Sequence, residues 1–105
     1  MAEALKVTTV ADVPPGEVRT FLVGGRRLAI ANAGGSFYAI DDVCTHDGGP
    51  LAEGQLEGYT IACPRHGAKF DIRTGQALTM PATEPTAAHE VKVDGGEVYV
   101  KLRES

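Results

Sequence analysis

Short runs of β-forming residues alternate with pairs of glycines along this chain. Glu17–Val23 and Arg26–Asn32 flank one glycine pair, and Ser36–Asp41 follows the next. The last pair lies between Val91–Val93 and Val98–Val100. Adjacent glycines permit the positive φ angles that tight hairpins require. The pattern therefore predicts antiparallel hairpins in the first half of the chain and again near its end.

Helical periodicity is almost absent. No stretch keeps the apolar period of a sustained α-helix, and the one helical candidate is a turn near Thr9–Val13. Short strands at this spacing are typical of an all-β sandwich or a partly open barrel. We therefore expect an all-β fold built from antiparallel strands.

The middle of the chain breaks this strand rhythm. From Asp42 to Pro81 the sequence is rich in glycine and proline, with short strands predicted at Tyr59–Ala62 and around Lys69–Ile72. We interpret the chain as one domain, residues 1–105, in which a smaller lobe (about 42–81) is inserted into a base lobe (about 1–41 and 82–105).

The candidate chemistry lies in that smaller lobe. Cys44 and His46 form one short motif and Cys63 and His66 a second, with 16 residues between His46 and Cys63. Two thiolates and two imidazoles suit a metal site of mixed sulfur and nitrogen donors. In a Rieske-type [2Fe–2S] centre one iron takes two cysteines and the other takes two histidines. One cysteine and one histidine from each motif would provide that arrangement.

The residues around these ligands extend the match. Cys44–Leu51, Cys63–Asp71 and the pair Thr74-Gly75 together resemble the Rieske-type ferredoxin family. The resemblance implies an antiparallel β-sandwich base with a smaller cluster-binding lobe, one [2Fe–2S] cluster, and a role as a soluble bacterial electron carrier. It also implies two partners, an NAD(P)H-dependent flavoprotein reductase and a terminal oxygenase of the ring-hydroxylating dioxygenase type. The chain would then be an electron-transfer component and not an enzyme.

The chain departs from the respiratory relatives of that family in an informative way. Those proteins carry a further cysteine in each ligand loop, where this chain has Gly49 and Arg65. They also place a serine and a tyrosine hydroxyl near the cluster sulfurs, where this chain has Ala68 and Phe70. Fewer hydrogen bonds to sulfur stabilise the reduced state less, so we expect a potential of roughly −150 mV, low for such centres.

Composition and charge limit the binding partners and the cellular location that we expect for this protein. The formal charge of −4 argues against nucleic-acid binding and suits docking to a basic surface. No apolar run is long enough to span a membrane, and the N-terminal residues lack the pattern of a secretory signal. We therefore expect a cytoplasmic protein without a membrane anchor, and a monomer suffices for an electron shuttle.

Several alternatives remain open at this stage. The two cysteines could form a disulfide, although a reducing compartment disfavours one. The chain could be the small Rieske subunit of an assimilatory nitrite reductase or another redox complex. It could also be a zinc-binding interaction module, although zinc sites usually pair cysteine with cysteine and histidine with histidine. We expect His89 to be a base-lobe or surface residue, and Asp41 and Asp42 to cap the first ligand loop.

Overall fold

The computed structural model describes residues 4–42, 51–63, 67–79 and 85–102. Every strand pairing in this part of the chain is antiparallel. The elements are β1 (Ala4–Thr9), the 3-10 helix η1 (Val10–Asp12), β2 (Val18–Val23), β3 (Arg26–Ala33), β4 (Ser36–Asp41), the 3-10 helix η2 (Leu51–Glu53), β5 (Leu56–Glu57), β6 (Thr60–Ala62), β7 (Lys69–Asp71), β8 (Ala88–Asp94) and β9 (Glu97–Lys101). The predicted all-β antiparallel fold is confirmed.

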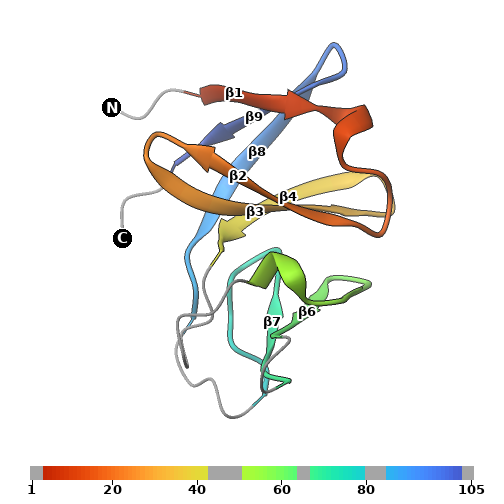
Figure 1. Cartoon of the computed structure of the whole chain (residues 1–105), viewed down its shortest axis with the longest axis vertical. Helices are drawn as coiled ribbons and strands as arrows, with labels where there is room; N and C mark the ends of the chain where they lie inside the picture. Colours follow the sequence, from red (N-terminus) through yellow and green to blue (C-terminus); the bar gives the residue numbers. More distant parts are fainter. Residues whose placement is uncertain (1–3, 43–50, 64–66, 80–84, 103–105) are drawn as a thin grey trace.

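Two sheets of unequal size make up the molecule. The larger has the strand order β1-β9-β8-β4-β3-β2 and the smaller has the order β5-β6-β7. The larger sheet is therefore assembled from both ends of the sequence, joined where Ala39 pairs with His89. In Figure 1 the smaller sheet lies below β2, β3 and β4. The part of the chain described here contains no helix long and apolar enough to cross a membrane.

The predicted hairpins are present. β2 pairs with β3, β3 with β4, and β8 with β9, each across a glycine pair with positive φ. At the last turn, Gly95 and Gly96 have φ angles of 59° and 80°, which residues with a side chain adopt only at a cost. The helical turn near Thr9–Val13 is also confirmed, as η1.

Three elements escaped prediction: β1, β5 and η2. β1 pairs with β9, which lies at the other end of the sequence. No local turn marks such a long-range pairing. β5 has two residues and η2 has three, which is too short for a periodic pattern to emerge.

The core has two parts, which share β3 as a common wall. Leu28 and Ile30 point to one side and Ala29 and Ala31 to the other, and all four are buried. The upper core, within the larger sheet, contains Val13, Val23, Leu28, Ile30, Ala39 and Val100. The lower core, between the two sheets, contains Ala29, Ala31, Ile40, Leu51, Ile61, Cys63, Ala68, Phe70 and Ile72. The alanines leave room for bulkier side chains of the smaller sheet.

η2 packs closely against the end of β6. A Cβ atom added at Gly54 would lie 1.7 Å from the carbonyl oxygen of Ala62, far inside any permitted contact. The Gly54 N–H also donates to the Leu51 carbonyl at 2.9 Å. Glycine is therefore required at position 54 by close approach to Ala62, the residue that precedes Cys63.

We predict that Gly54→Ala destabilises the fold by about 2–3 kcal/mol, because the backbone of η2 or β6 must shift to relieve the overlap. Gly58→Ala is the matched control from the same lobe, since its added Cβ would meet nothing within 4 Å. That control should cost only about 1 kcal/mol, for the left-handed backbone alone. Urea denaturation of both variants measures the difference, and equal losses would contradict the close-packing argument.

Candidate metal centre

Cys63 is the one predicted ligand that lies among the described residues. It follows β6 directly and begins the turn that leads to β7. Cys44, His46 and His66 lie outside the described residues. Cys63 is 1% exposed and is a free thiol.

Two backbone hydrogen bonds close the turn after Cys63. The Cys63 N–H donates to the Ala68 carbonyl at 2.6 Å, and the Gly67 N–H donates to the Cys63 carbonyl at 2.9 Å. Gly67 has a φ of 73°, in the region that favours glycine. The pairing of Ala62 with Lys69 then continues directly into the smaller sheet. The backbone of Cys63 is therefore bonded to that of Gly67 and Ala68, on the other side of residues 64–66.

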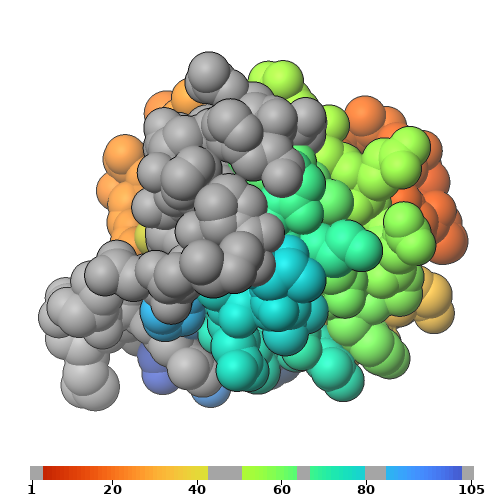
Figure 2. Space-filling view, turned by 90° about the horizontal axis from the view of Figure 1, so that it is seen from below, coloured from red at the N-terminus to blue at the C-terminus, as the bar shows by residue number. Residues whose placement is uncertain are grey.

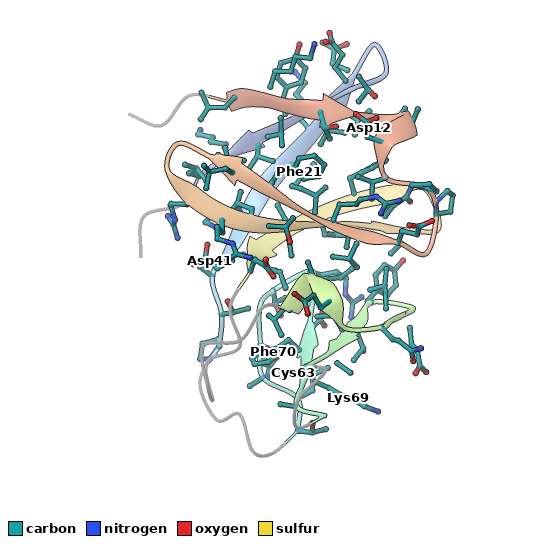
Figure 3. All side chains as sticks on the ribbon, in the orientation of Figure 1. Asp12, Phe21, Asp41, Cys63, Lys69 and Phe70 are labelled. Carbon is teal, nitrogen blue, oxygen red and sulfur yellow. The ribbon has the colours of Figure 1, made fainter. Side chains whose placement is uncertain are left out.

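The surroundings of Cys63 are apolar. Leu51, Ala68 and Phe70 belong to the same lower core and are each 0% exposed. In Figure 3, Cys63 and Phe70 lie next to β7, beneath the larger sheet. Ala68 and Phe70 offer no hydroxyl group to a sulfur atom at this site. Cys63 is thus shielded from water by apolar side chains on the side that the structure describes.

The donor set fits a [2Fe–2S] cluster on chemical grounds. A buried free thiol in an apolar surrounding can supply a thiolate ligand to a metal. The sequence provides one more cysteine and two histidines in matching short motifs. These residue types are those that a Rieske-type centre uses.

Asp41 anchors the end of β4, at the lower edge of the larger sheet (Figure 3). Arg26 donates two hydrogen bonds to its carboxyl group, at 3.0 and 2.9 Å. His89 Nε2 lies 2.8 Å from Asp41 Oδ1, and the His89 side chain is fully buried. His89 is therefore a buried residue of the larger sheet. The sequence left open whether it lies within the base or at the surface, and the structure shows that it is buried.

Asp42, the next residue, accepts a long-range hydrogen bond that the sequence did not reveal. Its Oδ1 accepts a hydrogen bond from the N–H of Ala52 at 2.7 Å. This bond acts across ten residues and is not the local loop capping expected from the sequence, which concerns residues outside the described part of the chain. Because such a partner depends on the folded path of the chain, no short motif could have identified it.

A cluster of aromatic and charged groups joins the smaller sheet to β4 of the larger sheet. The Arg73 guanidinium lies 4.3 Å above the Tyr59 ring, and Tyr59 meets Tyr38 edge to face at 5.8 Å. Arg73 also donates hydrogen bonds to Asp71, which lower the pKa of that carboxyl group. This stabilisation is present above the ordinary pKa of an aspartate and is lost as the pH falls through the lowered pKa. Residues 51–63 and 67–79 form the green to cyan surface in Figure 2.

Comparison with known proteins identifies the family of this chain. The chain matches the Rieske [2Fe-2S] domain family over residues 3–98. It is 43% identical over 97 residues to the 3-phenylpropionate/cinnamic acid dioxygenase ferredoxin subunit of Escherichia coli (strain K12), and the match covers 91% of each chain.

Solved structures of similar proteins extend the agreement to the fold. The ferredoxin of carbazole 1,9a-dioxygenase from Nocardioides aromaticivorans IC177 has a TM-score of 0.92 at 33% identity, covering 95% of this chain and 98% of that chain. A chain from the complex of reduced oxygenase and oxidized ferredoxin in carbazole 1,9a-dioxygenase has a TM-score of 0.86 at 43% identity, covering 93% of this chain and 92% of that chain. On this evidence the chain belongs to the Rieske [2Fe–2S] family, and within that family it is a ferredoxin, an electron-transfer component and not an enzyme.

Proposed function

We propose that this ferredoxin carries single electrons from an NAD(P)H-dependent flavoprotein reductase to a terminal oxygenase of the ring-hydroxylating type, in the cytoplasm. The observation that carries the proposal is the buried free thiol of Cys63 in the apolar lower core. A flavoprotein suits the first step, because a flavin can divide the two electrons of a nicotinamide into single transfers. The carrier itself needs no substrate pocket.

Four residues are proposed to hold one [2Fe–2S] cluster: Cys44 and Cys63 on one iron, and His46 and His66 on the other. When bound, such a cluster accepts and releases one electron at a potential well above that of a cluster with four cysteine ligands. Thiolates donate strongly and favour the ferric state, so the iron with histidine ligands is the one expected to take up the electron. Residues 42–81 would form the cluster-binding lobe, with residues 1–41 and 82–105 as its base.

The lower core has two tasks in this proposal. The buried side chains of Leu51 and Phe70 exclude water from the Cys63 side of the site. Because Ala68 and Phe70 carry no hydroxyl group, they provide no side-chain hydrogen bond that would favour the reduced state. The protein would thus be tuned to the low end of the Rieske range of potentials.

The oxygenase partner is supported by a relative that is 43% identical and whose solved structure is a complex of reduced oxygenase and oxidized ferredoxin. The formal charge of −4 would favour a basic docking surface on the partner. Complexes of this kind are typically small and transient. A monomer is sufficient for such a shuttle.

The ligand assignment is tested by single substitutions. Cys63→Ala and His66→Ala should yield protein without the visible absorption of the cluster, because each removes one ligand of an iron. His89→Asn is the matched control: it alters a histidine that the proposal leaves out of the site, so the colour should remain. Iron, sulfide and zinc contents measured on each protein complete the test. A colourless unsubstituted protein with one zinc per chain would contradict the proposal.

The tuning argument predicts the effect of adding a hydroxyl group. Ala68→Ser should raise the midpoint potential, by an amount on the order of tens of millivolts, because a new hydrogen bond to sulfur stabilises the reduced cluster. Ala62→Ser is the control, since Ala62 precedes Cys63 but lies in the strand at the position paired with Lys69, outside the lower core. Redox titration of both variants provides the measurement. An unchanged potential in Ala68→Ser would refute the argument.

A further inference from the structure

Asp42 is the last described residue before the segment that contains Cys44 and His46, and its side chain is fully buried. Three donors meet its carboxyl group. The N–H of Ala52 donates to Oδ1 at 2.7 Å, the Thr20 hydroxyl donates to Oδ2 at 2.8 Å, and Arg27 Nη2 lies 3.4 Å from Oδ2. The side chain is therefore held by β2, β3 and η2 together.

The contact with Ala52 joins the two ends of residues 43–50. Asp42 precedes this segment and Leu51 follows it, so the hydrogen bond from the Ala52 N–H closes the segment at its base. The Asp42 N–H also donates to the Arg27 carbonyl at 3.0 Å, which fixes the backbone of Asp42 to β3. Both ends of the segment are thereby tied to the larger sheet.

η2 extends this connection to Cys63. Leu51 is 0% exposed and belongs to the same lower core as Cys63. Gly54, just after η2, lies against the carbonyl of Ala62, which directly precedes Cys63. A continuous set of contacts thus runs from the Asp42 carboxyl group through η2 to the strand end that presents Cys63.

We propose that Asp42 is a positioning residue for cluster binding, which ties η2, and through η2 the strand end at Cys63, to the start of the segment that carries Cys44 and His46. This inference rests on the proposed function, since it concerns the same four ligands. Without the carboxyl group, the N–H of Ala52 loses its acceptor and η2 is held less firmly to Asp42. Cys63 would then be less firmly placed relative to Asp42, and the cluster would be easier to remove.

The decisive comparison is between Asp42→Ala and Asp42→Asn. Asparagine keeps one oxygen that can accept from the Ala52 N–H, whereas alanine keeps none. We expect a chelator to bleach the cluster of Asp42→Ala about tenfold faster than that of the unsubstituted protein, and that of Asp42→Asn within about threefold. The EPR spectrum of reduced Asp42→Ala should also differ in its g values, while Asp42→Asn should retain the original spectrum.

A control separates positioning from general stability. The carboxylate of Asp12 caps η1, between β1 and β2, by accepting hydrogen bonds from Thr9. Asp12→Ala should lower the thermal unfolding temperature, followed by circular dichroism on the cluster-containing protein. The bleaching rate, measured below the unfolding temperature, should stay unchanged in this variant. The EPR spectrum should also stay unchanged.

The outcomes are distinct. If the unsubstituted protein binds no cluster, the proposed function fails before Asp42 is tested. If it binds one and Asp42→Ala has the same bleaching rate and EPR spectrum, the positioning role is overturned. Should Asp42→Ala fail to fold, Asp42→Glu replaces it, because an extra methylene in a fully buried site displaces the carboxyl group. Faster bleaching with altered g values in Asp42→Glu supports the role, and unchanged behaviour overturns it.

Discussion

The burial of β3 on both faces is the constraint on which this structure depends. Its alternating side chains divide into a large pair, Leu28 and Ile30, and a small pair, Ala29 and Ala31. The large pair fills the upper core, and the small pair lets the smaller sheet pack closely beneath. A shift of β3 by one residue would exchange the two sets and disrupt both cores. The position of Cys63 therefore depends on the register of a strand that supplies no ligand.

The same packing links stability to redox chemistry. Phe70 and Leu51 contribute to the free energy of folding by burying apolar surface, and they also keep water away from Cys63. Ala68 joins this core with its side chain and accepts the Cys63 N–H with its carbonyl. Since the groups around metal ligands influence the potential of a bound cluster, residues that stabilise the fold are also placed to influence the potential of the cluster proposed here.

The sequence predicted what depends on local chemistry. Glycine pairs located the hairpins, and two short motifs of cysteine and histidine indicated the type of cofactor. Contacts between distant segments were less accessible: the pairing of β1 with β9, the approach of Gly54 to Ala62, and the hydrogen bond from Ala52 to Asp42. Each of these depends on how remote parts of the chain meet, which no local pattern encodes. His89 was predicted only in part. The lack of a neighbouring cysteine argued against a metal ligand, but it did not reveal that the side chain is buried against Asp41.

The central claim is that two histidines and two cysteines hold a redox-active cluster in this chain. Pulsed EPR of the unsubstituted protein after reduction with dithionite tests it most directly, because it detects nitrogen nuclei bound to the reduced iron. The account predicts a rhombic signal with an average g value below that of the free electron, coupled to two inequivalent histidine nitrogens. A signal without nitrogen coupling, or a protein that gives no signal and contains zinc, would contradict it.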